Sequence, residues 1–308
     1  MNIIDTNNWH IILDKMIVIG GSARSGTTIV GKLINSLKDV EYQFEPPMLE
    51  SILLKENELS EKSLKELLQS YFFDNFLLDC LSGRNINLNK NDDSCILNVK
   101  SEKEIQKRYE KSFTRNELEE IVKKTTFSFK LPEIVFFLDL INSQFDKNRT
   151  ILMHRNPNDV INSIIKKEWF SDEFLNEKHP SQIKAVKIIE SIKIPYWVKH
   201  EDEVFWVNAT ELDRCAYYYK RVSTEILTHY KKSIIIDYDI FVQEPEKIIN
   251  IISDSLNLEM TEKTYEIINS VNYQDKKRDN LLLSVSNDLR EDILLLDTKL
   301  KKLSLKDK

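Results

Sequence analysis

The sequence predicts an α/β fold, a parallel sheet with helices on both faces. Three observations carry this prediction: short, wholly apolar runs, amphipathic helical patterns that follow them, and glycine- or proline-marked junctions between the two. Buried parallel strands are continuously apolar, and each crossover to the next parallel strand usually contains a helix. A chain of 308 residues can form one large domain of this kind or two small ones.

The elements follow in order along the chain. A strand at residues 16–19 precedes a Gly-rich turn and an apolar helical pattern at 29–37; a second strand at 126–129 precedes a helix at 133–143. A third strand at 150–153 leads to a helix that Pro157 opens, and a fourth at 233–236 leads to a helix from Pro245 to position 256. We interpret residues 60–124 as a helical insertion and 169–208 as an irregular lid over the ligand cleft, both within a single domain spanning residues 1–308.

Composition argues against several classes of protein. The net charge of −6 disfavours non-specific nucleic-acid binding, and three cysteines without CxxC spacing make neither a disulfide framework nor a zinc site. The five histidines also lack metal-ligand spacing, so no metal is assigned. Residues 1–15 do not resemble a signal peptide, and no apolar run approaches the ~20 residues that span a bilayer. We expect a cytoplasmic protein without a membrane or nucleic-acid partner.

The turn after the first strand has the features of a phosphate-binding loop. Glycines let successive backbone N–H groups converge on one anion, and the following helix N-terminus adds partial positive charge. Arg24 supplies a permanent charge, and two threonines supply hydroxyl donors. A nucleotide-triphosphatase loop requires Lys where this chain has Thr27, which argues against ATP or GTP hydrolysis. The predicted loop residues are Gly21, Ser22, Ala23, Arg24, Ser25, Gly26, Thr27 and Thr28.

A second anion site is predicted after the third strand. Arg155 lies at the carboxyl end of that strand, where ligands bind in open α/β sheets. Ser163 follows two helical turns later, so the two side chains can share one phosphate. Together with the loop, this arrangement suits a nucleotide that carries phosphates at both ends of its ribose.

These motifs resemble a known family. The patterns G-x-x-R-S-G-T-T and R-x-P-x-D-V-x-x-S are similar to the two donor-binding motifs of sulfotransferases that use 3′-phosphoadenosine 5′-phosphosulfate (PAPS), including bacterial, tyrosylprotein and carbohydrate sulfotransferases, whose fold is of the P-loop type. Residues 236–239 with Pro245-Glu246 resemble a later family segment, and the resemblance covers about residues 16–260. It implies PAPS as donor and 3′,5′-ADP as product. It also implies that the loop from Arg24 to Thr28 holds the 5′-phosphosulfate and that Arg155 and Ser163 hold the 3′-phosphate.

The resemblance also indicates three further positively charged residues as candidates for binding the donor. A basic segment near the C-terminus closes over the 3′-phosphate in this family, and the matching residues here are Lys276, Lys277 and Arg278. A solvated charge run is the alternative interpretation of that segment.

Sulfuryl transfer needs a base for the acceptor proton and positive charge near the leaving phosphate. Glu45 is the predicted base, because it follows Phe44 and precedes two prolines after an apolar segment, at a spacing from Arg24 similar to that in tyrosylprotein and carbohydrate sulfotransferases. Lys130 ends the second strand and resembles the family's catalytic lysine. Arg24 is the third predicted catalytic residue. A surface or helix-capping role is the alternative for Glu45.

The acceptor is predicted to be a small molecule. Aromatic residues concentrate in residues 169–208 beside an acidic run at 201–203, an environment that suits a cation, so we favour a cationic natural product sulfated on oxygen or nitrogen. A sugar hydroxyl and a peptide tyrosine are the rival acceptors, and simple packing of the aromatics is the alternative interpretation. A P-loop nucleotide kinase or GTPase and a non-catalytic nucleotide-binding protein are the rival functions.

Overall fold

Within the described residues, five strands form one sheet in the order β2-β3-β1-β4-β7. The structure is a computed structural model that describes residues 15–72, 81, 83, 86–145, 147–181, 183–271 and 279–305. The strands are β1 (Ile17–Gly21), β2 (Val40–Phe44), β3 (Thr126–Lys130), β4 (Arg149–His154) and β7 (Ser233–Asp237). The pairs β1–β3 and β2–β3 are parallel. The predicted α/β class with a parallel sheet is confirmed.

The chain forms two compact units. Unit 1 comprises residues 1–20, 27–151 and 240–273, and unit 2 comprises residues 21–26, 152–239 and 274–308. The division falls between Gly26 and Thr27, so residues 21–26 of the predicted phosphate-binding loop belong to unit 2, and Thr27 and Thr28 begin the following helix in unit 1.

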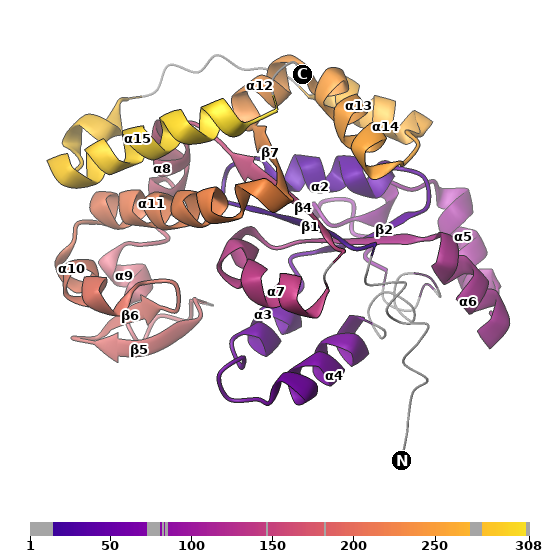
Figure 1. Cartoon of the computed structure of the whole chain (residues 1–308), viewed down its shortest axis with the longest axis horizontal. Coiled ribbons are helices and arrows are strands. Elements are labelled where there is room, and N and C mark those ends of the chain that lie inside the picture. The colour runs from indigo at the N-terminus through magenta and orange to yellow at the C-terminus, as the bar shows by residue number, and fades with distance from the viewer. Residues whose placement is uncertain are drawn as a thin grey trace. The chain divides into compact units, whose positions relative to one another are not determined.

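In unit 1, helices lie on both faces of the strands (Figure 1). Helix α2 (Thr27–Ser36) packs on β2 and β3, and α14 (Glu262–Ser270) packs on α2. The other face carries α3 (Pro47–Leu53), α4 (Glu61–Phe72) and α7 (Leu138–Gln144), the last preceded by a 3₁₀ helix at Pro132–Phe137. The remaining helices are α5 (Glu102–Glu110), α6 (Arg115–Lys124), α12 (Tyr238–Gln243, which begins in unit 2), α13 (Pro245–Leu256) and a 3₁₀ turn at Ile96–Asn98.

The predicted strands of unit 1 are completely enclosed; β1 is wholly apolar, whereas β3 also contains Thr126, Ser128 and Lys130. All five residues of β1 and all five of β3 are buried. Sequence reasoning placed an apolar helix at 133–143, whereas the structure begins that segment as a 3₁₀ helix after Pro132 and continues it as α7. The predicted helix from Pro245 to position 256 matches α13, which Asn257 ends in the left-handed conformation at φ 53°.

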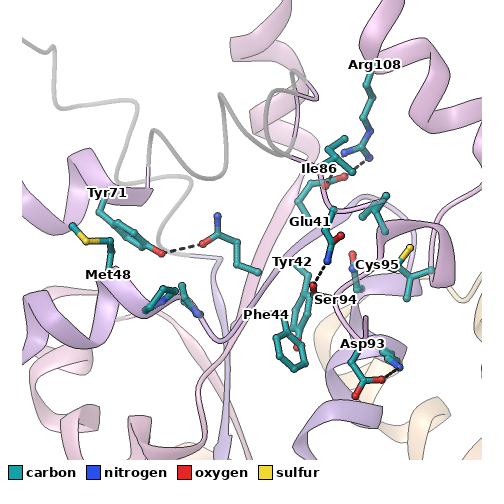
Figure 2. A pocket seen from close by; sticks show the side chains of 18 of the residues that line it. Glu41, Tyr42, Phe44, Met48, Tyr71, Ile86, Asp93, Ser94, Cys95 and Arg108 are labelled. Atoms are coloured by element: carbon teal, nitrogen blue, oxygen red, sulfur yellow. Dashed lines mark hydrogen bonds and ion pairs between the residues drawn. The ribbon is translucent and has the colours of Figure 1, made fainter. Parts of the chain in front are cut away.

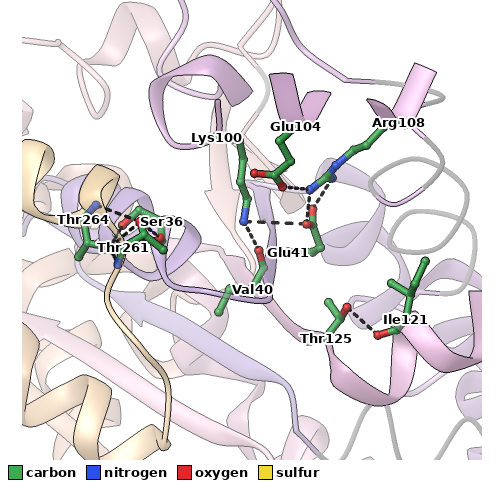
Figure 3. Close-up of polar contacts among 10 residues, drawn as sticks. All are labelled: Ser36, Val40, Glu41, Lys100, Glu104, Arg108, Ile121, Thr125, Thr261 and Thr264. Carbon is green, nitrogen blue, oxygen red and sulfur yellow. Dashed lines mark hydrogen bonds and ion pairs between the residues drawn. The ribbon is translucent and has the colours of Figure 1, made fainter. Parts of the chain in front are cut away.

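Strand β2 begins at a buried ion network (Figure 3). Arg108 donates two hydrogen bonds to Glu41, at 2.6 and 2.9 Å, and a third to Glu104 at 2.7 Å. Lys100 donates to the carbonyl of Val40 at 2.6 Å. These contacts anchor an edge strand to the helical insertion, which contains α4, α5 and α6.

Unit 2 is built around α11 (Glu211–His229), which packs on α15 (Asn287–Leu303) and on α8 (Pro157–Ile165) (Figure 1). Helix α11 begins at Thr210, whose hydroxyl accepts a hydrogen bond from the N–H of Asp213 at 3.1 Å. The predicted irregular segment contains a hairpin of β5 (Ala185–Ile189) and β6 (Ile192–Pro195), with α9 (Asp172–Leu175) and α10 (Glu203–Asn208). Short 3₁₀ turns occur at His200–Asp202, Tyr230–Lys232 and Leu281–Ser284.

Candidate active site

The loop of unit 2 has a shape that only glycine permits at two positions. Gly21 has φ 135°, and a Cβ there would lie 2.3 Å from the carbonyl oxygen of Met153. Gly26 has φ 92°, and its Cβ would lie 2.2 Å from the ring of Tyr238. Both conformations are rarely open to residues with side chains. The loop is therefore held tightly against β4 and the end of β7.

Hydrogen bonds inside unit 2 fix the loop further. The Ser25 hydroxyl donates to the carbonyl of Ser22 at 2.6 Å, and the backbone N–H of Ala23 donates to the phenolic oxygen of Tyr218 at 2.9 Å. Tyr218 lies on α11, 195 residues along the chain. These contacts give Ser22, Ala23 and Ser25 a clear part in shaping the loop, and phosphate binding by them stays a prediction.

The structure brings the loop arginine to the second predicted anion site. Nε of Arg24 donates to Oγ of Ser163 at 2.9 Å, and Nη1 of Arg155 donates to the carbonyl oxygen of Arg24 at 3.3 Å. Arg24 itself has φ 67°, an uncommon backbone conformation for a residue with a side chain. Sequence reasoning assigned Arg24 and Ser163 to opposite phosphates of the donor, whereas these two side chains contact each other here.

Arg155 is surrounded by groups that orient it. Its Nη2 donates to Asp159 at 2.8 Å, its guanidinium lies 4.5 Å from the ring centre of Tyr238, and its Nε lies 4.0 Å from Asp239. Burial raises the pKa of Asp239 above its usual value, and the negative charge of Asp237 raises it further. Among the described residues, no group accepts a hydrogen bond from Nε of Arg155, although the carboxylate of Asp239 lies 4.0 Å away.

Tyr218, Tyr238 and Asp239 are functional candidates that sequence reasoning missed. The segment from Asp237 to Asp239 had been matched to the family, but no ligand role was given to it. The signal was a tyrosine and a carboxylate directly after a buried strand, the position where ligands bind in α/β sheets. Only the fold shows that the Tyr238 ring contacts both Gly26 and Arg155.

Unit 1 brings the other two predicted catalytic residues together. Nζ of Lys130 donates to Oε1 of Glu45 and, at 3.2 Å, to Oγ1 of Thr28 in the first turn of α2. The same ammonium lies 4.2 Å from the ring centre of Phe44. Lys130 is almost completely buried, and burial lowers its pKa below the usual 10.5, against the opposing effect of Glu45.

The backbone sets this pair in place. Residues Phe44 and Lys130 are partners in the β2–β3 register, and the N–H of Glu45 donates to the carbonyl of Lys130 at 2.8 Å. Glu45 has φ 42°, in the left-handed region that costs a residue with a side chain about 1 kcal/mol. Such conformations persist where the surroundings over-determine them, often at functional sites. The side chain remains 44% exposed and therefore accessible to a substrate.

A cavity of about 670 Å³ lies beside this pair in unit 1 (Figure 2). Its walls come from β2, α2, α4 and the segment at residues 86–96, and Phe44 and Pro46, which flank Glu45, are among them. Most of the residues that line it are aromatic or aliphatic. We call it the β2 cavity.

The aromatic residues of the predicted lid have a packing role in unit 2. Phe170, Trp197 and Trp206 are buried and meet edge to face with ring centres 5.1–5.7 Å apart. Arg214 bonds the carbonyl oxygens of Phe170 and Trp206 and the carboxylate of Asp172. The packing alternative therefore describes these three rings, and a cationic acceptor stays a prediction.

Three other predictions concern the basic segment near the C-terminus, metal binding and membrane-spanning helices. Lys276, Lys277 and Arg278 lie outside the described residues. Across the described part of the chain, no group of three or more His, Cys, Asp or Glu side chains is placed to hold a metal ion. No helix in that same part is long and apolar enough to cross a membrane.

One family model matches most of the chain. The family model described as "Sulfotransferase family" matches residues 16–262. No curated protein matches the sequence. Similar solved structures include the sulfotransferase domain of the Synechococcus PCC 7002 olefin synthase, at 15% identity and TM-score 0.44, covering 95% of this chain and 89% of that one. A Mycobacterium avium sulfotransferase aligns at 12% identity and TM-score 0.46, covering 95% of this chain and 80% of that one. An Alicyclobacillus acidocaldarius sulfotransferase aligns at 11% identity and TM-score 0.44, covering 92% of this chain and 95% of that one.

Proposed function

We propose that this chain, which belongs to the sulfotransferase family, transfers a sulfuryl group from PAPS to a hydroxyl or amine of a small acceptor. The observation that carries the proposal is the contact of Lys130 with both Glu45 and Thr28. Through this contact, the buried ammonium of Lys130 is bonded to a carboxylate that can accept a proton. It is also bonded to the N-terminus of the helix that follows the predicted phosphate loop. The cytoplasmic location remains a prediction.

The donor supplies an activated sulfuryl group, and 3′,5′-ADP leaves with the electron pair of the broken S–O bond. An acceptor hydroxyl forms the new O–S bond, and its proton passes to the carboxylate of Glu45. Lys130 offsets the negative charge that develops on the leaving 5′-phosphate, a role that its buried ammonium suits because electrostatic effects are stronger away from water.

Unit 2 supplies the proposed grip on the 3′-phosphate. Nε of Arg155 is a buried donor whose hydrogen bond no described residue accepts, and Arg24 and Ser163 lie next to it. A hydrogen bond between an arginine and a phosphate contributes roughly 1.5–3 kcal/mol. This set supports the binding of a phosphate, which in the proposed donor is the 3′-phosphate.

Replacement of the base tests the proposal. Glu45→Gln should lower kcat for transfer of ³⁵S from labelled PAPS by about 10²–10⁴-fold, the usual contribution of general base catalysis. Binding of 3′,5′-ADP, measured by calorimetry, should change little. Glu133→Gln is the matched control. Glu133 also raises the pKa of Lys130 through space, but it lies in the 3₁₀ helix after β3, whereas Glu45 follows β2. Full activity in Glu45→Gln would exclude this carboxylate as the base.

A further inference from the structure

The β2 cavity adjoins the proposed catalytic pair. Phe44 contributes its ring to the cavity wall and contacts the ammonium of Lys130, and Pro46 follows Glu45 directly. On α2, Thr28, Lys32 and Asn35 are spaced as i, i+4 and i+7, so they share one helical face. Thr28 contacts Lys130, whereas Lys32 and Asn35 line the cavity. The cavity therefore extends along α2 away from the catalytic pair.

The charges in the cavity wall are paired with one another. Lys32 forms an ion pair with Asp93 at 2.6 Å, and Arg108 holds Glu41 through two hydrogen bonds. The remaining wall is mainly aromatic and aliphatic, with Phe44, Met48 and Tyr71 prominent in Figure 2. A charged ligand would enter this space without an unpaired opposite charge to meet it, at a substantial desolvation cost.

Two buried polar atoms in the same wall have no hydrogen-bond partner among the described residues. Asn35 is only 5% exposed, and no described residue donates a hydrogen bond to its Oδ1. The phenolic oxygen of Tyr42 is also buried, and no described residue bonds to it. A buried polar group left without a hydrogen bond costs about 1–3 kcal/mol. Both atoms therefore favour a bound molecule that can satisfy them.

These two atoms lie along one side of α2. A Cβ on Gly31 would be 2.2 Å from the Tyr42 oxygen, so this phenol rests on the helix at Gly31. Asn35 is one turn further along the same face. Burial raises the pKa of Tyr42 well above 10, so the phenol keeps its proton and can donate. One hydroxyl group can accept from the phenol of Tyr42 and donate to Oδ1 of Asn35.

We infer that the β2 cavity binds the acceptor as a neutral, largely apolar molecule with two hydroxyl groups. One hydroxyl is sulfated at Glu45, and the second is bound by Tyr42 and Asn35. This assignment rests on the proposed function and adds the substrate class to it. The rule it sets is that the second hydroxyl, and not a charge, distinguishes the preferred acceptor.

A matched series of rigid compounds tests the rule. The probes are 4,4′-dihydroxybiphenyl, 4-phenylphenol without the second hydroxyl, 4-(4-aminomethylphenyl)phenol as the cation, and 4′-hydroxybiphenyl-4-carboxylate as the anion. Calorimetry with and without 3′,5′-ADP gives Kd, and ³⁵S transfer gives kcat/KM. The diol should bind at least about fivefold more tightly than 4-phenylphenol, which is the gain expected if even one of its two additional neutral hydrogen bonds contributes fully. Both charged compounds should bind more weakly than 4-phenylphenol.

Variants connect that preference to the cavity. Tyr42→Phe should lower the affinity for the diol by about fivefold and leave that for 4-phenylphenol unchanged, because only a hydroxyl is removed. Tyr71→Phe is the matched control, since Tyr71 lines the same cavity but already donates to Gln43 at 3.2 Å, and it should leave the preference intact. Asn35→Leu is the second test of the same site, and circular dichroism checks that each variant is folded.

The outcomes separate the two proposals. Tighter binding of the cation or anion, equal binding of the diol and 4-phenylphenol, no binding of any probe, or a preference that survives both Tyr42→Phe and Asn35→Leu would overturn the acceptor assignment. Failure of the proposed function gives another result: no ³⁵S transfer to any acceptor and no binding of 3′,5′-ADP, while the diol still binds in a Tyr42-dependent manner.

Discussion

Substitution of Gly26 by alanine should strain the phosphate loop through two separate effects. Gly26 has φ 92°, and an L-residue forced into positive φ loses roughly 1–2 kcal/mol. The added methyl would also lie 2.2 and 2.5 Å from two ring carbons of Tyr238. Carbon atoms in favourable contact are about 3.5–4 Å apart, so the ring must move by more than 1 Å, and such overpacking costs about 1–3 kcal/mol.

The expected total is a loss of about 2–5 kcal/mol in the free energy of unfolding, the sum of the backbone and overpacking costs. Tyr238→Ala removes the ring, so Gly26→Ala in that background should cost only the backbone part. Urea denaturation of the wild type, both single variants and the double variant measures the coupling, which should be about 1–3 kcal/mol. An equal cost of Gly26→Ala in both backgrounds would refute the described packing of Gly26 on Tyr238.

The remaining predictions concern two ionisable side chains that are largely buried. Burial lowers the pKa of His154 below the usual 6.5 despite the nearby Asp237 and Asp297, so below pH 6.5 the unfolded chain binds a proton that the folded chain does not. Stability should therefore fall as pH falls from 6.5 toward the lowered pKa, and His154→Asn should flatten this dependence in urea denaturation at pH 7 and pH 5.5. Arg108→Met should destabilise the chain by about 3 kcal/mol or more, because it leaves Glu41 buried without its main partner. The double variant with Glu41→Leu should regain part of that loss, and no recovery would contradict the pairing.

Much of the sheet could be predicted from the sequence because its central strands are buried on both faces. Residues 16–19 and 150–153 are wholly apolar or nearly so, and all but the first residue of β4 are buried. Strand β2 was recognised only as an apolar segment, since Glu41 and Gln43 interrupt its apolar pattern. Glu41 is accommodated there by Arg108, which comes from a helix 67 residues later. No local pattern contains that information.

The candidate site was predicted in its residues but not in its contacts. Glu45 and Lys130 were proposed separately, and the β2–β3 register that places them together depends on which strands are neighbours. Likewise, Tyr218 on α11 bonds the loop at Ala23 across 195 residues. The sequence could not show that Phe170, Trp197 and Trp206 of the predicted lid pack together, because a cluster of aromatics in a sequence looks the same whether it forms a binding surface or a core.

Calorimetric titration with 3′,5′-ADP, 5′-AMP and ATP, on the wild type and on Arg155→Ala, tests the central claim most directly. One charge-assisted bond from Arg155 to a 3′-phosphate corresponds to an affinity difference of about 10–150-fold. The wild type should therefore bind 3′,5′-ADP at least about tenfold more tightly than either other nucleotide, and Arg155→Ala should lose most of that preference. Tighter binding of ATP, or a preference for 3′,5′-ADP that Arg155→Ala leaves unchanged, would contradict the account.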